Sequence, residues 1–173
     1  FTNILTINGT DITEKLNSDY TNNLMSAKSV AEAISSSTDL AATAETIVSG
    51  SAITGSNIDG GATNFIKINS VDIGTVTWLN NDSNGALATA INNLSDLTGV
   101  TASIENDVLK LTAADGRNIS VDTGGNGTSS GLTDTTTTVT TTATAGKAEL
   151  DATASAALVI GAGELVINGV DLA

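Results

Sequence analysis

The side chains that could do chemistry in this sequence are carboxylates, hydroxyls, amides and a few amines. The 173 residues include 19 Asp or Glu and six Lys or Arg, with no Cys and no His. Without thiolates and imidazoles, a disulfide framework and a zinc site are both excluded, and catalysis would have to rest on Asp, Glu, Lys, Ser and Tyr. We therefore expect no metal and no cofactor.

Two carboxylate pairs come closest to a catalytic arrangement, Asp11 with Glu14 and Asp134 with Asp151. A catalytic pair needs two different environments that move the pKa values of its members apart. The acidic residues here are spread along surfaces that we expect to be solvated, and no such cluster is visible. We interpret them as solvated charge, and we predict that the chain is not an enzyme.

A glycine-rich segment, 124–131 (GGNGTSSG), is similar to the calcium-binding nonapeptide. Ser129 occupies the position where that motif needs a carboxylate, and no second copy follows. We interpret the segment as a plain linker with a flexible backbone.

Hydroxyl groups are concentrated in a threonine-rich run, 133–145 (TDTTTTVTTTATA). The β-branched Thr side chain favours an extended backbone, so the run predicts an exposed strand or hairpin. The same hydroxyls could accept O-linked sugar, and both interpretations stay open. The candidate acceptors are Thr135, Thr136, Thr137, Thr138, Thr140, Thr141 and Thr142.

Charge and hydropathy exclude several kinds of partner. The net charge is −13, so a phosphate backbone would be repelled, and we expect no binding to nucleic acid. No apolar run approaches the roughly 18 residues that span a bilayer, and Phe1 does not open a signal peptide. We expect a soluble chain without membrane insertion, and we read it as an excerpt of a longer protein.

The secondary-structure elements that must position these groups follow a repeated sequence segment. Its three copies lie at 5–12, 66–73 and 165–172. Each copy predicts a short strand, a turn and a second short strand. The shared positions are Ile7 and Asn8, Ile68 and Asn69, and Ile167 and Asn168. The third copy is cut off at Ala173.

The stretch 65–121 carries the one complete pattern of strands and helix. After the turn at Asn69, Asp82 or Ser83 can cap a helix whose apolar positions fall at i, i+4 and i+7 and which Gly99 stops. Those positions are Leu87, Ile91 and Leu94, and Thr89, Asn92 and Asn93 lie on the other side. Two tight hairpins follow, one turning at Asn106-Asp107 and one at Asp115-Gly116.

The N-terminal stretch repeats this pattern more loosely. Ser18 or Asp19 is the expected N-cap of a helix that the run 35–37 interrupts. Segment 26–35 aligns with 83–92, which places Val30 on Leu87 and Ile34 on Ile91. Segment 40–44 stands where 99–102 stands in the central stretch, and short strands are expected at 46–48 and 52–54.

These patterns predict an α+β fold of two related small units, in which antiparallel strands pack against a helix, followed by a β-rich C-terminal extension. The predicted divisions are a first unit at 1–59, a complete central unit at 60–124, a Gly- and Thr-rich extension at 125–162 and the start of a third copy at 163–173. Within the extension we expect a turn at 146–151 and a strand at 156–160. We also expect the end copies, 5–12 and 165–172, to lie at the same pole.

The central stretch resembles the IN motif of bacterial flagellins. The resemblance rests on Ile68-Asn69, on the helix pattern at 82–92, on 99–103 and on the turn at 115–117. It covers 65–121 well, the first unit in part, and residues 125–160 hardly at all. Ser70 departs from the Gly that is usual after the motif's Asn, and the long helical ends that polymerise flagellin are missing.

This resemblance implies the surface-exposed variable region of a flagellin, a secreted structural protein that serves motility and filament surface properties. It implies an extracellular location on the flagellum and other flagellin subunits as partners through regions outside this chain, while a surface glycan stays open on the threonine hydroxyls alone. The alternative is an interaction or adhesion domain of a flagellar cap or hook-associated protein, since those proteins carry the same motif.

Overall fold

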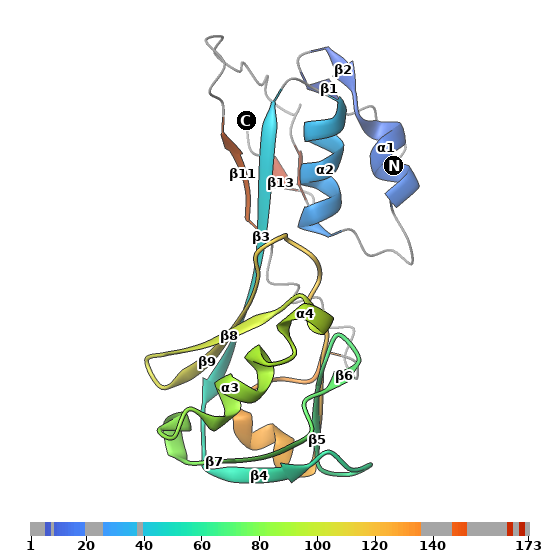
Figure 1. Cartoon of the computed structure of the whole chain (residues 1–173). Coiled ribbons are helices and arrows are strands. Elements are labelled where there is room, and N and C mark those ends of the chain that lie inside the picture. The colour runs from blue at the N-terminus through green and yellow to red at the C-terminus, as the bar shows by residue number, and fades with distance from the viewer. Residues whose placement is uncertain are drawn as a thin grey trace. The chain divides into compact units, whose positions relative to one another are not determined.

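The structure, a computed structural model, describes residues 6–7, 9–19, 26–37, 40–135, 147–151, 166–167 and 170–171 (Figure 1). The chain divides into two compact units. The two-segment unit comprises Phe1–Ala44 and Lys147–Ala173, and the inserted unit comprises Glu45–Gly146. Helices and antiparallel strands occur in both units, which confirms the predicted α+β class.

The division between the units differs from the predicted boundary at 59/60. Residues 45–59 belong to the inserted unit, because Ile53 and Ile58 lie in its apolar core. The division falls inside one strand, β3 (Ala41–Ala52), which replaces the two short strands expected at 46–48 and 52–54. The expected break at Ser49-Gly50 is a shift of register between Ser49 and Ala52 within this strand.

The inserted unit contains three groups of paired strands, in the orders β3-β9-β8, β10-β5-β6 and β4-β7. Within each group the strands pair antiparallel. The strands besides β3 are β4 (Ser56–Asp59), β5 (Phe65–Ile68), β6 (Val71–Asp72), β7 (Thr75–Trp78), β8 (Thr101–Glu105), β9 (Val108–Ala113) and β10 (Val121–Gly124).

One helix fills the space between these strands. Figure 1 shows α3 (Ala86–Asn92) lying between the β8–β9 hairpin and β7. Leu87 and Ile91 are fully buried and Leu94 is partly buried, while Thr89, Asn92 and Asn93 are exposed, as the periodicity predicted. The core around α3 consists of Ile53, Ile58, Ile66, Ile68, Ile73, Val76, Trp78, Leu87, Ile91, Val100, Ala102, Leu109, Leu111, Ala113, Ile119, Val121 and Leu132.

The N-cap residue of α3 is Gly85 and not Asp82 or Ser83 as predicted, but the Asp82 carboxylate still caps the first turn of the helix from three residues before that position. Asp82 lies in the short helical turn η1 (Asn80–Asp82) and is 4% exposed. Its Oδ1 accepts the N–H of Leu87 at 2.9 Å, and its Oδ2 accepts the N–H of Ala88 at 2.9 Å. These two amides belong to the first turn of the helix, where no backbone acceptor exists, so the carboxylate supplies both missing acceptors.

α3 is shorter than the helix that the apolar periodicity predicted. α3 stops at Asn92, and a separate turn, α4 (Ser95–Thr98), precedes Gly99. Gly99 has a φ of 70° and closes α4, which confirms its predicted role as a stop.

The first of the two predicted hairpins is confirmed and the second is wrong. Asn106 and Asp107 have φ values of 52° and 64°, as in the two-residue turn that joins β8 and β9. After Gly116 the chain does not return along β9, and β10 instead pairs with β5. Val121 then faces Ile68, so the apolar faces of two distant strands meet in the core.

The glycine-rich segment is not the flexible linker that its composition suggested. It forms a 3-10 helix, η2 (Gly125–Ser130), whose Gly127 and Ser130 are buried. The carbonyl oxygens of Ser129 and Gly131 accept the N–H groups of Thr54 at 3.0 Å and Ser51 at 2.8 Å. A Cβ at Gly127 would collide with the carbonyl oxygen of Phe65, so glycine here permits close packing of backbone against backbone.

The two-segment unit contains paired short strands and two helices. Its described elements are β1 (Thr6–Ile7), β2 (Thr10–Asp11), α1 (Thr13–Asp19), α2 (Ala27–Ser37), β11 (Lys147–Asp151), β12 (Val166–Ile167) and β13 (Val170–Asp171), and the start of β3 also belongs to it. Its core is formed by Ile7, Ile12, Leu16, Ala33, Ile34 and Leu40.

Three expectations for this unit are wrong. Ser18 and Asp19 end a separate helix and do not cap α2, whose N-cap is Ser26, since its Oγ accepts the N–H of Ser29 at 3.1 Å. The serines at 35–37 form the last turn of α2 and do not interrupt it. Residues 147–151 form a strand where a turn was expected. The expected strand at 156–160 lies outside the described residues.

Candidate functional site

In all three copies of the repeated segment, two short strands that are separated by two residues pair antiparallel. β1 pairs with β2, β5 with β6 and β12 with β13. The residues that flank the turn are Ile7 and Thr10, Ile68 and Val71, and Ile167 and Val170. The first and third copies both belong to the two-segment unit, as a chain that loops back requires. The predicted motif positions Asn8 and Asn168 lie outside the described residues.

In the central copy, Ile68 and Asn69 have separate roles. Ile68 is fully buried in the core of the inserted unit. Asn69 and Ser70 form the turn with φ values of 49° and 69°, a left-handed conformation that Asn tolerates and Ser rarely adopts.

The amide of Asn69 ties the hairpin to two other segments. Its Nδ2 donates to the carbonyl oxygen of Thr98 at 2.8 Å, and its Oδ1 accepts the N–H of Ser120 at 2.8 Å. Its backbone N–H also donates to the carbonyl oxygen of Ser120 at 2.9 Å. A side-chain amide offers a donor and an acceptor on two separate atoms, so the motif's Asn can bind two segments at once and joins the hairpin, the end of α4 and the start of β10.

A second contact recurs between copies. In the central copy Oδ1 of Asp72 accepts the N–H of Gly74 at 2.8 Å, and in the first copy Oδ1 of Asp11 accepts the N–H of Thr13 at 2.8 Å. The hydrogen bonds from Thr13, its side chain first and then its backbone, lower the pKa of Asp11 below the ordinary value of 3.8. In these two copies the bond fixes the direction in which the chain leaves the hairpin.

A third contact joins the end of each unit's main helix to a strand. Asn92, the last residue of α3, accepts the N–H of Ala102 through Oδ1 at 2.7 Å and donates through Nδ2 to its carbonyl oxygen at 2.9 Å. In the two-segment unit, Ser35 of α2 accepts the N–H of Ala42 at 2.9 Å and donates to its carbonyl oxygen at 3.3 Å. The aligned positions therefore make equivalent contacts with different side chains.

The turn predicted at 115–117 carries an ion pair. Nη2 of Arg117 lies 2.8 Å from Oδ2 of Asp115, and Nε donates to both carboxylate oxygens at 3.0 Å. The hydrogen bonds to Asp115 and its charge raise the pKa of Arg117 above its ordinary value. The guanidinium covers Gly99, where an added Cβ would collide with it, so this glycine also permits close packing.

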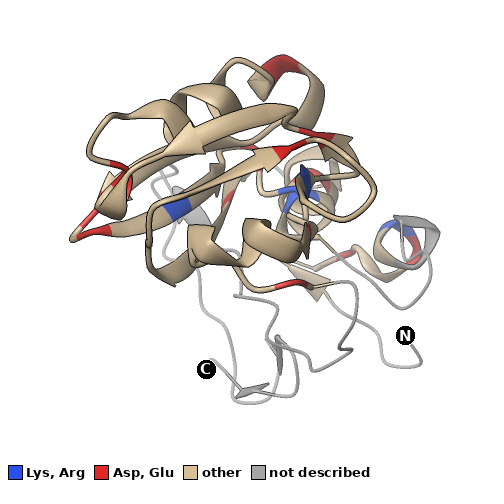
Figure 2. Ribbon diagram, turned by 90° about the horizontal axis from the view of Figure 1, so that it is seen from below, with Lys and Arg blue, Asp and Glu red and all other residues tan. Residues whose placement is uncertain are grey.

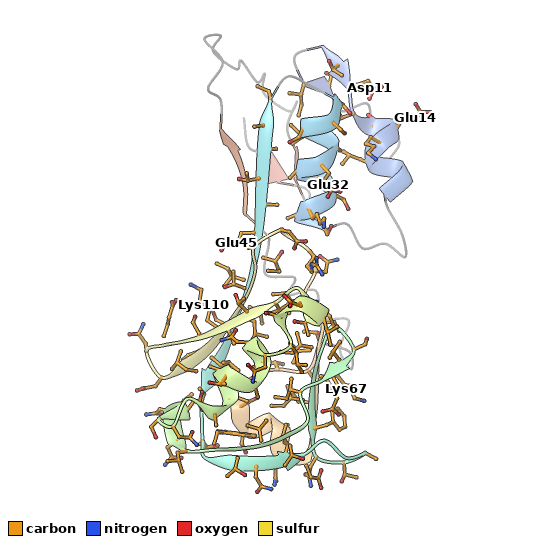
Figure 3. The ribbon with its side chains drawn as sticks, in the orientation of Figure 1. Asp11, Glu14, Glu32, Glu45, Lys67 and Lys110 are labelled. Atoms are coloured by element: carbon orange, nitrogen blue, oxygen red, sulfur yellow. The ribbon has the colours of Figure 1, made fainter. Side chains whose placement is uncertain are left out.

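The acidic residues of the described part of the chain lie on several different elements (Figure 2). Asp11 ends β2, where it makes the turn contact described above, and Glu14 lies in the first turn of α1 (Figure 3). Among the described residues, no group of three or more acidic side chains could hold a metal ion. Within the same part of the chain, no helix is long and apolar enough to cross a membrane.

Of the candidate glycan acceptors, Thr135 is described and positions 136–138 and 140–142 lie outside the described residues. Oγ1 of Thr135 accepts the N–H of Val121 at 2.8 Å and donates to its carbonyl oxygen at 3.1 Å. A sugar on this oxygen would remove the bond that Thr135 donates to Val121.

Sequence patterns did not reveal the partners of Asn69 or Asn92. Thr98 and Ser120 are 29 and 51 residues from Asn69, and no local period links positions so far apart. The available signal was the recurrence of Asn after a buried Ile in all three copies. An exposed Asn at the end of a helix, such as Asn92, carries no signal of its own.

Comparison with known proteins agrees with the motif residues. A family model described as the flagellin hook IN motif matches residues 66–115. Flagellin B from two strains of Helicobacter pylori is 42% identical over 69 residues, which cover 39% of this chain and 13% of each relative. The chain thus matches only a small part of the length of these relatives, and it is flagellin-like over that part.

Proposed function

We propose that this flagellin-like chain is a structural part of a bacterial flagellar filament, from the surface-exposed variable region of a flagellin. The observation that carries the proposal is the match at 66–115, which spans the buried Ile68, the bridging Asn69, the α3 helix and the β8–β9 hairpin. The motif thus lies within the inserted unit and contributes much of its apolar core.

In this role the chain sets the spacing and the surface of the filament and performs no catalysis. It projects outward on the extracellular flagellum, and other flagellin subunits are contacted through regions outside this chain. The net charge of −13 would keep such surfaces apart and hydrated when many copies are displayed side by side.

We also propose that the threonine-rich run carries O-linked glycan, at Thr136, Thr137, Thr138, Thr140, Thr141 and Thr142 in preference to Thr135. Intact-mass analysis of protein from its native source should show masses above that of the bare polypeptide, and peptide mapping should place the sugar in 136–142. A mass equal to the bare polypeptide, or sugar on other segments only, would remove this proposal.

Immunogold electron microscopy tests the filament role. Antibodies raised against this chain are applied to intact cells of the source bacterium, with antibody pre-absorbed on the purified chain as the control. We expect gold along the whole filament. Gold confined to the filament tip or to the hook junction would contradict the proposal and support the cap or hook-associated alternative.

A further inference from the structure

β8 is the last strand of its sheet, so among the described strands none lies beside one of its edges. Along an antiparallel ladder, residue pairs joined by backbone hydrogen bonds alternate with pairs that are not. The pair that flanks a two-residue turn is hydrogen-bonded, and here it is Glu105 with Val108. The backbone groups of Glu105, Ser103 and Thr101 therefore face β9. The backbone N–H and C=O groups of Ala102 and Ile104 point away from β9, toward the open edge of the sheet. Unpaired groups at such an edge can pair with a strand of another chain.

Asn92 occupies both outward groups of Ala102. A primary amide presents an acceptor and a donor side by side, so it can satisfy one residue of a strand edge as a pairing strand would. Because Asn92 binds both groups of Ala102, Ile104 is the one residue of β8 whose outward backbone groups remain available for pairing. A single open residue cannot nucleate a ladder, which needs successive bonded pairs.

Two other strands are closed in the same manner. At the edge strand β10, Thr135 uses Oγ1 to bond both backbone groups of Val121. On β3, pairing with β9 begins only at Thr46, and Ser35 bonds both backbone groups of Ala42. Three different side chains thus make the same two-way contact, each with the backbone N–H and C=O of a single strand residue.

We propose that Asn92 closes the edge of β8 against strand addition by a second copy of this chain. The excluded partner is an extended segment such as β8 itself, whose sequence TASIE combines β-branched residues with a single charge. The closure is a property of the inserted unit and does not depend on the proposed function.

The test compares Asn92→Ala with Asn93→Ala. Both residues are exposed and adjacent at the end of α3, and the Asn93 side chain makes no hydrogen bond within the described residues. Self-association is measured by sedimentation over a wide concentration range. We expect Asn92→Ala to associate at least tenfold more strongly than Asn93→Ala while Trp78, buried in the core, keeps its native emission. Equal association of the two folded variants would overturn the proposal.

A double variant shows whether the association uses this edge. Ser103 is exposed on β8, and a lysine there hinders strand addition by its charge. Asn92→Ala with Ser103→Lys should return to the association of the wild-type chain. If the double variant associates as strongly as Asn92→Ala, the contact lies elsewhere and the proposal fails.

Hydrogen exchange of the unmodified chain decides the matter if Asn92→Ala does not fold. The amide of Ala102 should exchange at least tenfold more slowly than that of Ile104, although both face the open edge. Equal rates would show that Asn92 does not close the strand.

Discussion

The two-segment unit and the inserted unit use the same polar contacts in different settings. Both contain a hairpin of identical register, and in both the chain leaves this hairpin through an Asp that accepts the amide two residues later. In both, the end of the main helix bonds one residue of the following strand on both backbone groups. These contacts are what the repeat preserves.

The connections between these contacts differ. In the inserted unit, the short helix α4 separates α3 from β8, whereas α2 and β3 are joined by a few residues. Asp82 caps α3 through two bonds, and Ser26 caps α2 through its hydroxyl. The comparison teaches that the units diverge in loops and caps, while the bonds that fix hairpin, helix and strand against one another remain.

The largest effect should come from shortening the aligned core residues Ile91 and Ile34. Both are buried, and Ile-to-Ala changes in a core cost about 2–5 kcal/mol. Urea unfolding followed by the single tryptophan, Trp78, reports on the inserted unit. We expect Ile91→Ala to lower that stability by this amount and Ile34→Ala to leave it within about 0.5 kcal/mol. Equal shifts would mean that the units do not unfold separately.

Removing the Asn69 amide should have the next largest effect. Asn69→Gly keeps the left-handed turn and loses two side-chain hydrogen bonds, which costs about 1–3 kcal/mol. Asn69→Ala should cost about 1 kcal/mol more, because alanine is strained at this φ. Asn106→Gly is the matched control, since Asn106 has a similar φ of 52° and its side chain bridges nothing in the described structure. If Asn69→Gly were as mild as the control, the bridge would not stabilise the unit.

Replacing the Asp82 carboxylate should cost about 1–2 kcal/mol, as expected for loss of a helix cap. In Asp82→Asn the remaining oxygen still accepts one of the two backbone N–H groups. The new NH₂ group faces the second N–H, which then has no acceptor. Asp96, an exposed acid in the first turn of α4, supplies the control Asp96→Asn. Thermal unfolding monitored at Trp78 separates the two, and an equal loss in both variants would point to general charge and not to the cap.

A smaller gain is expected from Ser70→Gly. The other two copies have Gly at this turn position, and Gly9 adopts a φ of 79° where Ser70 is held at 69°. Relief of the left-handed strain should stabilise the inserted unit by about 1 kcal/mol, and Gly9→Ser should destabilise the two-segment unit by a similar amount. Chemical denaturation of both variants tests this symmetry. A loss of stability in Ser70→Gly would show that the serine side chain has a role of its own.

The smallest effect concerns the acid range and Asp11. Because the pKa of Asp11 is lowered in the folded chain, its contribution to stability is complete above the ordinary value of 3.8 and is lost as the pH falls through the lower folded value. Titration of the Thr13 amide shift by NMR should therefore show a midpoint below 3.8, and Asp11→Asn should abolish it. A midpoint above that value would contradict the turn contact.

Local patterns predicted the local features well. The hairpin turns at Asn69 and Asn106, the buried face of α3, the Asp82 cap and the Gly99 stop all depend on residues within one or two turns of each other. Predictions failed where distant backbone decides the outcome. The glycines at 124–131 read as a linker because the strands they pack against, around Ser51 and Phe65, are far away in sequence.

The pairing of β10 shows the same limit. Asp115-Gly116 is an ordinary hairpin signal, but β9 is already paired with β3 on one edge and β8 on the other, so β10 pairs with β5 instead. The Asn69 bridge was equally hidden, because its two partners come from different segments. Sequence reasoning thus found the motif residues Ile68 and Asn69 but not what the asparagine does.

The central claim is that Asn69 joins the hairpin to α4 and β10, and scalar couplings across hydrogen bonds measure this directly. In labelled protein, we predict a coupling between Nδ2 of Asn69 and the carbonyl carbon of Thr98, and another between the amide nitrogen of Ser120 and Cγ of Asn69. The β8–β9 ladder supplies reference couplings in the same spectrum. Clear couplings in that ladder, with none at Asn69, would contradict the account.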